Sequence, residues 1–340
     1  MIKKRLLNVL GVIGFAVVLA TLSLTAACSP AAGPEKTKIE MFGGRPADSF
    51  TVLVFALASF ISSDSDFLSA TAISSGGVAD GLKVMTAEPD RRSYTTGLTA
   101  TILDPMFGDN EGFNSKFLAA QSRPLQLWVT LDPDIKTPAD FAGKTIGVPR
   151  EIKNYWDIFE GVLINAGVRD SVEVIHGGLG GNAQVLLDGT VDVTFSLFDI
   201  TQPEVKASQY MEQMAVRGEL HVVDLGKENI DWASAQIGFP SFAAQVPAGS
   251  PFVGDTPTWA VAFTYSYVAD EELPNEVAYE IARIAYDHGS KGDFANFHAV
   301  GGYMTPERLP YSDYTDPQDI EYWYHPGALE FYREIGVPGL

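Results

Sequence analysis

The sequence predicts an α/β fold made of two lobes. First, strand-like and helix-like segments alternate from about residue 38 to residue 242, which is typical of sheets covered by helices. Second, the alternation restarts after Pro124, so a second unit begins there. Third, the composition changes at about Ala243 without starting a third complete unit. We therefore expect the chain to cross back and complete the first lobe, with hinges near 123–126 and 240–245.

The first unit alternates three strands with two helices. The second helix opens at a glycine turn, SSGG (74–77), which frees the backbone for a sharp change of direction. The strands are IEMF (39–42), FLSATAI (67–73) and TATILDP (99–105), and the helices are FTVLVFALASFI (50–61) and VADGLKVM (78–85).

The second unit repeats the alternation. Its predicted strands are LQLWVTL (125–131), KTIGVP (144–149), VEVIHG (172–177) and VDVTFSL (191–197), and its helices are TPADFAG (137–143), NYWDIFEGVLINAG (154–167) and NAQVLLDG (182–189). After it, WAVAFTYSYVA (259–269) is predicted to be one long aromatic strand. PNEVAYEIARIAYDHG (274–289) is predicted to be a helix, with Pro274 near its start and Gly289 after its end.

The N-terminus has the features of an export signal. Lys3, Lys4 and Arg5 precede an uncharged apolar run, and small residues lead to Cys28, the only cysteine of the chain. The stretch LTAAC resembles a bacterial lipobox, in which the cysteine is lipidated, although Leu24 stands one position further from the cysteine than is usual. An uncleaved membrane anchor and a cleaved chain with a free thiol are the alternatives.

These features divide the chain into a processed leader, a tether, two lobes and a terminal helix. At the end of the chain, apolar residues recur roughly at helical spacing between His325 and Gly336, which predicts a short amphipathic helix. The predicted parts are a signal peptide (1–27), a tether (28–37), lobe I (38–124 plus 243–315), lobe II (125–242) and a C-terminal helical segment (316–340).

The charge excludes one class of partner. The formal charge of −20 becomes −23 once a leader with three basic and no acidic residues is removed, and no basic patch remains, so nucleic-acid binding is not expected. The five histidines show no metal-binding spacing, and no G-x-S-x-G motif occurs. Residues 178–183 (GLGGNA) fit G-x-G-x-x-A with Asp199 at the distance of a ribose-binding acid. This motif leaves a secreted oxidoreductase as a remote alternative, but a turn that aims a helix N-terminus at an anion is the favoured interpretation.

Four segments in succession resemble the TAXI-family solute receptors of TRAP transporters. They are PDIKTPADFAGKTIGVP (133–149), AQVLLDGTVDVTFSL (183–197), AAQVPAGSPFVGDTPTWAVAF (243–263) and YHPGALEFYREIG (324–336). The resemblance covers about residues 38–337, and the HPGA..FYRE.G ending is its most specific part.

The resemblance implies a type II periplasmic-binding-protein fold, in which two lobes close on a ligand like a clam around a hinge. The C-terminal helix would dock across the back face of the lobes. It also implies a protein that is not an enzyme, needs no cofactor and acts as a monomer outside the cytoplasm. It would be held to a membrane by lipid on Cys28 and would deliver its ligand to a TRAP permease.

The resemblance further implies an organic-acid ligand of the glutamate or 2-oxoglutarate class. The family's G-S-G-T loop is replaced here by PREIKNYW (149–156), which puts the usual substrate in doubt. The segment IKTPADFAGKTIGV is also similar to ABC-transporter receptors for sulfonates, nitrate or thiamine precursors, and such a receptor is the first alternative.

Loops at the carboxyl ends of strands are expected to line the ligand cleft. Arg45 and Arg150 come from opposite lobes and are predicted to clamp a carboxylate, because a guanidinium matches its two oxygens. Tyr155 is predicted to supply an aromatic wall. The predicted ligand-binding residues are Gly44, Arg45, Ser75, Gly76, Asp104, Arg150, Asn154, Tyr155, Phe198 and Asp199.

Overall fold

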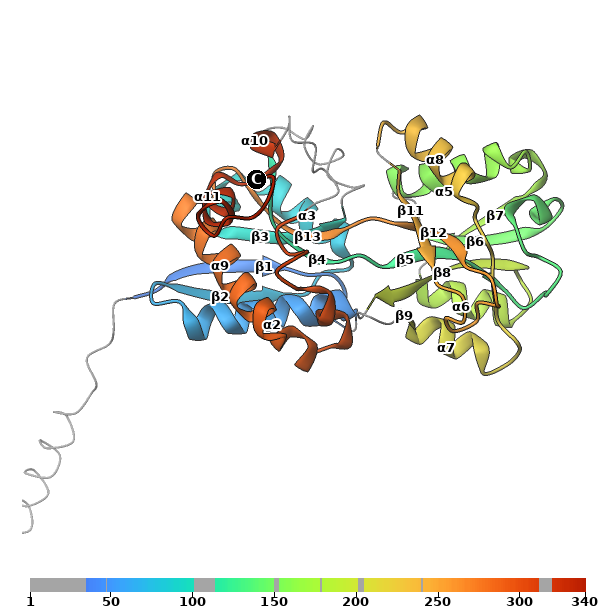
Figure 1. The fold of residues 1–340 in the computed structure, drawn as a ribbon, viewed down its shortest axis with the longest axis horizontal. Coiled ribbons are helices and arrows are strands. Elements are labelled where there is room, and N and C mark those ends of the chain that lie inside the picture. The colour runs from blue at the N-terminus through green and yellow to red at the C-terminus, as the bar shows by residue number, and fades with distance from the viewer. Residues whose placement is uncertain are drawn as a thin grey trace, which may run out of the picture. The chain divides into compact units, whose positions relative to one another are not determined.

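Two β-sheets, each packed with helices, organise the chain (Figure 1). The computed structural model describes residues 35–46, 48–100, 114–149, 153–177, 179–200, 205–239, 241–311 and 320–340. Residues 38–340 form one unit. We call the part built on the five-stranded sheet lobe I and the part built on the eight-stranded sheet lobe II. The predicted α/β architecture with two lobes is confirmed.

Lobe I has the strand order β2-β1-β3-β13-β4. Strands β1 and β3 are parallel, whereas β13 is antiparallel to both of its neighbours. Helix α2 buries Leu53, Leu57 and Ile61, which recur every four residues and so share one face. The elements are β1 (Thr37–Phe42), α2 (Ser49–Asp64), β2 (Leu68–Ile73), α3 (Val78–Ala87), η1 (Pro89–Tyr94), β3 (Thr95–Ala100), β4 (Ser115–Ser122), β13 (Tyr265–Asp270), α9 (Asn275–Lys291), η5 (Asp293–Asn296), η6 (Ala299–Tyr303), α10 (Ile320–Trp323) and α11 (Pro326–Glu334), where η marks a 3₁₀ helix.

Lobe II has the main strand order β11-β12-β5-β8-β6-β7, with β10 paired to β5 and β9 paired to β8. Strand β5 enters from lobe I and runs antiparallel to β8 and β12, just as β13 does in the other sheet. The elements are β5 (Leu125–Thr130), η3 (Pro138–Phe141), β6 (Thr145–Pro149), α5 (Lys153–Asn165), η4 (Arg169–Ser171), β7 (Glu173–Gly177), α6 (Leu179–Leu187), β8 (Val193–Ile200), β9 (Val205–Ala207), α7 (Gln209–Ala215), β10 (His221–Val222), α8 (Lys227–Gln236), β11 (Ala243–Val246) and β12 (Thr258–Ala262).

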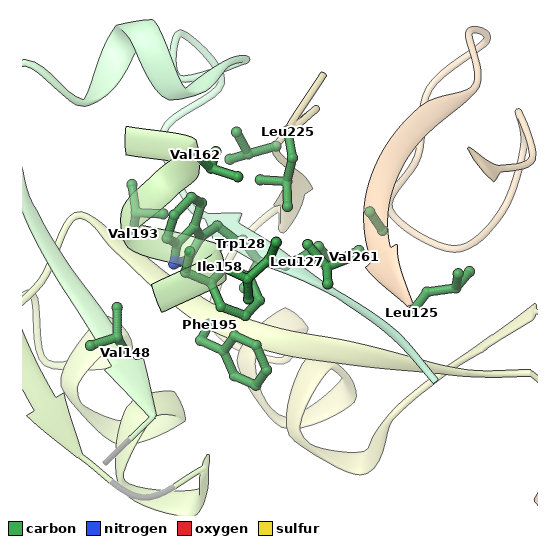
Figure 2. Close-up of a cluster of buried hydrophobic side chains, with 14 of the residues drawn as sticks. Leu125, Leu127, Trp128, Val148, Ile158, Val162, Val193, Phe195, Leu225 and Val261 are labelled. Atoms are coloured by element: carbon green, nitrogen blue, oxygen red, sulfur yellow. The ribbon is translucent and has the colours of Figure 1, made fainter. Parts of the chain in front are cut away.

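The core of lobe II is centred on Trp128 of β5. Its side chain is fully buried, and its ring meets those of Phe141 and Phe159 edge-on, at centroid distances of 5.2 and 5.3 Å. Figure 2 shows Trp128 beside Ile158 of α5 and near Phe195 of β8. Aromatic pairs in this edge-on geometry stabilise a core beyond the area that they bury. The core therefore joins α5 to the central strands of the sheet.

The two sheets are joined by two short crossovers. Arg123 and Pro124 connect β4 to β5, and Phe263 and Thr264 connect β12 to β13. The Arg123 Nη2 group donates a hydrogen bond to the Ala262 carbonyl at 3.2 Å, which ties the first crossover to the strand that leads into the second.

The prediction of one long strand over 259–269 was wrong. The chain changes sheets at 263–264, so the second crossover lies there and not at 240–245. Residues 243–262 pair within the sheet of lobe II, although the sequence placed them in lobe I. Because Phe263 and Thr264 are themselves buried, the apolar run continues across the junction and gives no sign of it.

Helix α9 does not end at Gly289. It continues to Lys291, and Gly292 follows with a φ of +73°, the left-handed conformation that ends many helices. Gly289 is buried within the helix, where an added Cβ would lie 2.7 Å from the carbonyl oxygen of Met304. This glycine therefore permits close packing of α9 against the following loop.

The terminal helix α11 is confirmed, with His325 as its N-cap and Pro326 at its first position. It packs against α9 and β4, both in lobe I, and the Tyr332 hydroxyl donates to the Leu118 carbonyl at 2.8 Å. Among the described contacts the helix therefore belongs to the scaffold of lobe I, whereas the resemblance had implied docking across both lobes. No helix in the described ranges is both long and apolar enough to cross a membrane.

Candidate ligand-binding site

The carboxyl edges of both sheets lie at the two crossovers. In lobe I, Tyr265 at the start of β13 lies opposite Ala100 at the end of β3 and opposite Ser122 at the end of β4. In lobe II, Leu125 at the start of β5 lies opposite Phe198, near the end of β8, and opposite Ala262, the end of β12. Ligands of open α/β sheets bind at such edges. The chain therefore provides one region where loops from both lobes are available to a ligand.

Two of the predicted loops in lobe I are joined by hydrogen bonds. Gly43, after β1, donates its N–H to the Ile73 carbonyl at 2.8 Å, and Ser75, after β2, donates to the Gly44 carbonyl at 2.9 Å. The Ser75 hydroxyl also donates to the Gly43 carbonyl at 2.7 Å. Gly44 and Ser75 are therefore brought together as predicted, and Ser75 acts by holding the two loops in register.

Arg45 extends this joined pair of loops. Its Nε donates to the Gly76 carbonyl at 3.0 Å, and its backbone N–H donates to the Asp48 carboxylate at 3.2 Å. The side chain is exposed, and no described residue accepts a hydrogen bond from its terminal NH2 groups. Arg45 is thus oriented by Gly76 while the outer part of its guanidinium remains available to a carboxylate.

The joined loops also lead into two helices. Helix α2 begins at Ser49 and α3 begins at Val78, directly after the two loops. The first N–H groups of a helix have no intrahelical acceptor and carry partial positive charge, so they favour an anion. Two such ends beside Arg45 form a site suited to an anionic group.

Three buried polar atoms at this end of lobe I have no partner in the described structure. They are the Thr51 hydroxyl, the Gln121 side-chain carbonyl and the Ser122 hydroxyl. Thr51 lies against Gly43 and Gly44, since an added Cβ on either glycine would come within 3.3 Å of its Oγ1. The sequence analysis missed all three, and no local pattern points to them because they lie within a regular helix and strand.

An aromatic stack flanks the same edge. Phe50 in the first turn of α2 stacks on Tyr265 at the start of β13, with ring centroids 4.6 Å apart and an interplanar angle of 9°. Phe263, on the second crossover, lies 6.1 Å from Tyr265. These rings tie the N-terminus of α2 to the hinge. The prediction that Tyr155 supplies an aromatic wall is not tested, because the structure describes only the backbone of Asn154 and Tyr155, in the first turn of α5.

Lobe II contributes Asp199, near the end of β8. One carboxylate oxygen, Oδ1, is buried and has no hydrogen-bond donor among the residues that the structure describes. Burial raises the pKa of Asp199 to about 6. The neighbouring Phe198 is fully buried in the core, so its predicted contact with a ligand is not supported by this arrangement.

Three predicted residues lie outside the described ranges: Asp104, Arg150 and Cys28. The described residues hold no group of three or more acidic, histidine or cysteine side chains that could bind a metal ion.

The dinucleotide-binding interpretation of residues 178–183 does not match the topology. Helix α6 begins in this glycine run after β7, as expected for a turn that presents a helix N-terminus. However, β6 lies between β7 and β8, so Asp199 is not on the strand next to the turn. A ribose-binding acid occupies that adjacent strand. The geometry therefore favours the anion-binding turn over the cofactor site.

Comparisons with known proteins agree with this architecture. A sequence profile described as the NMT1-like family matches residues 114–336. The fold is similar to the ligand-binding component of an ABC-type import system from Staphylococcus aureus, solved with zinc bound. The TM-score is 0.50 at 8% identity, over 89% of this chain and 94% of that chain. An ATP-bound protein from Xanthomonas citri has a TM-score of 0.51 at 11% identity, over 88% of this chain and 100% of that one.

The periplasmic aliphatic sulphonate binding protein of Escherichia coli is a further structural neighbour. Its TM-score is 0.49 at 11% identity, over 90% of this chain and 94% of that chain. At these identities the likeness concerns the fold alone. No curated protein matches the sequence.

Proposed function

The chain belongs to the NMT1-like family, and on that premise we propose that it is an extracytoplasmic receptor that binds a small organic anion and delivers it to a membrane importer. One observation carries the proposal. Arg45 and the starts of α2 and α3 meet at the carboxyl edge from which both crossovers lead to the other lobe. Two crossovers of two residues each suit hinge closure around a ligand.

The importer is proposed to be of the ABC type. The ABC-type import component from Staphylococcus aureus shares the fold over most of both chains, which supports this choice. A TRAP permease is the second candidate, favoured by the succession of four segments that ends in HPGA..FYRE.G. The genes beside this one distinguish the two, because an ABC system includes an ATPase and a TRAP system includes a large fused permease.

Removal of Arg45 is expected to weaken binding of the anion at least tenfold. The ligand would first be found by a thermal-shift screen over organic acids and amino acids, in which a ligand at 100 times its Kd stabilises by about 2.7 kcal/mol. A hydrogen bond to a charged group contributes about 1.5–3 kcal/mol, which corresponds to at least a tenfold loss in Arg45→Ala. Calorimetric titration measures the change.

Two further variants test whether Arg45 acts through its geometry. Arg45→Lys keeps the charge but loses the planar fork, so its affinity should fall between those of the wild type and Arg45→Ala. Arg217 is exposed and follows α7, outside the joined loops, so Arg217→Ala should bind normally. If Arg45→Ala binds within threefold of the wild type, Arg45 is not part of the site.

The proposed location is the outer face of a membrane, with lipid on Cys28. The proposal rests on the single cysteine between an apolar leader and a polar tether. Cys28→Ser is expected to release the protein into the soluble fraction and to abolish labelling by a fatty-acid probe. Unchanged membrane association of this variant would favour an uncleaved anchor instead.

A further inference from the structure

Asp199 presents an acceptor that the described protein does not satisfy. Its Oδ1 is buried and lacks a donor among the described residues, while the residue itself is only half-buried. A buried acceptor without a donor destabilises the fold, so such a group calls for an explanation outside the fold itself. The position of Asp199, one residue beyond Phe198 at the carboxyl edge of β8, places it where a ligand is expected.

No charged neighbour explains the acid. The register places Lys206 of β9 opposite Asp199, but Lys206 is exposed. Of the other elements packed against β8, α7 carries Glu212, and η6 has His298 as its N-cap, while β5, β6 and α6 carry no charged residue. The raised pKa of Asp199 has burial as its only cause, so none of these groups acts as its counter-ion.

The charges on the lobe I side are not those of a site for a multiply charged anion. Arg45 is accompanied by Asp48, whose carboxylate accepts the Arg45 backbone N–H, and by Asp80 in the first turn of α3. Asp80 is offset by Lys83 at 3.4 Å, but Asp48 has no second cation recorded beside it. Together with Asp199, the described charged groups at the two edges therefore provide one place for a carboxylate and a surplus of negative charge.

We infer that the bound solute is an amino carboxylate, whose carboxylate is held by Arg45 and the helix N-termini and whose protonated amine donates to Asp199. The inference rests on the proposed function, because the carboxylate half of the ligand is the anion proposed above. An ammonium group supplies both the missing hydrogen-bond donor and the missing counter-ion. The predicted class is thus narrowed to amino acids, against the 2-oxo and 2-hydroxy acids of the same carbon skeleton.

The test compares matched solutes. Amino acids with acidic, aliphatic and aromatic side chains, glutamate among them, are titrated into the full mature chain beside their 2-oxo and 2-hydroxy counterparts, 2-oxoglutarate among them. At least one amino acid is expected to bind 30-fold or more tightly than both of its counterparts. Its affinity should fall about tenfold for each pH unit below 6, because a protonated carboxyl cannot serve as the counter-ion.

Two variants assign the effect to Asp199. Asp199→Asn keeps the shape but cannot ionise, so it should lose about 30-fold in affinity for the amino acid and should lose the pH dependence. Asp170→Asn, at an exposed position of η4 in the same lobe, is the matched control and should bind normally. Circular dichroism checks that both variants are folded, and the wild-type comparison stands without them.

Each outcome decides between the two levels of the proposal. Binding of only the oxo or hydroxy acids would overturn the amine contact and leave the anion receptor intact. Binding of the amino acid by Asp199→Asn within threefold of the wild type would also overturn it. If the folded wild-type protein binds no member of any series, the proposal of an organic-anion receptor fails, and the inference fails with it.

Discussion

Replacing Gly327 with alanine is expected to destabilise the protein by about 3 kcal/mol or more. An added Cβ would lie 2.0 Å from the carbonyl oxygen of Asn275 and 2.7 Å from its carbonyl carbon, at the start of α9. Both atoms belong to backbone, so α11 would have to move as a whole. That movement would disturb Phe331 and Tyr332, which α11 buries against lobe I. Urea unfolding followed by circular dichroism measures the loss.

The local geometry leaves little freedom at this position. The Gly327 N–H donates to the His325 Nδ1 at 3.2 Å, which caps the helix. Burial lowers the pKa of His325 to about 4, so the ring stays neutral near pH 7, as an accepting Nδ1 requires. Gly254→Ala is the control, since nothing lies within 4 Å of its added Cβ. If both variants unfold at the same urea concentration as the wild type, the close approach of α11 to α9 is not as described.

In the ligand-free protein, Asp199→Asn is expected to raise the free energy of unfolding by about 2–3 kcal/mol at pH 8. The carboxyl of Asp199 titrates at about 6 in the folded chain and at its ordinary value of 3.8 when unfolded. Each unit of this difference corresponds to about 1.4 kcal/mol. Because the folded state favours the protonated form, ionisation destabilises the fold, and asparagine avoids that cost.

The sign of the pH dependence distinguishes this effect from a simple change in packing. Between about pH 4 and pH 6 the folded protein binds more protons at Asp199 than the unfolded chain does, so the contribution of this group to stability falls as pH rises. The gap between variant and wild type should therefore shrink by about half at pH 5. Urea titrations at pH 5 and pH 8 measure it. A gap that is absent at pH 8, or equal at both values, would contradict the burial of an unpartnered carboxylate.

These two positions differ in how far sequence reasoning could reach them. Asp199 was predicted as a ligand contact because it follows a buried strand, and the carboxyl ends of such strands line clefts. Gly327 was noticed only as part of the HPGA ending. Its actual task, to let α11 approach Asn275, depends on a residue more than 50 positions earlier in the chain, and no periodicity reports such a contact.

Several elements could be predicted because their signals are local. The four-residue spacing of Leu53, Leu57 and Ile61 marked α2, and the SSGG turn marked the start of α3. The proline after His325 and the glycine at 336 marked both ends of α11, and Gly336 indeed has a φ of +74°. Each signal involves residues a few positions apart, which is the range over which backbone conformation is decided.

The sequence by itself determined the order of strands and helices, the restart after Pro124 and the loops that contain Gly44, Arg45, Ser75 and Asp199. Only the tertiary structure decided that the chain changes sheets at Phe263 and Thr264, within an unbroken apolar run. It also decided the pairing of His288 with Asp64 and Asp293, at 2.9 and 2.7 Å, where the first two residues are separated by 224 positions. Local periodicity records which face of an element is buried, but the partner on the other side of that face is chosen when distant segments pack together.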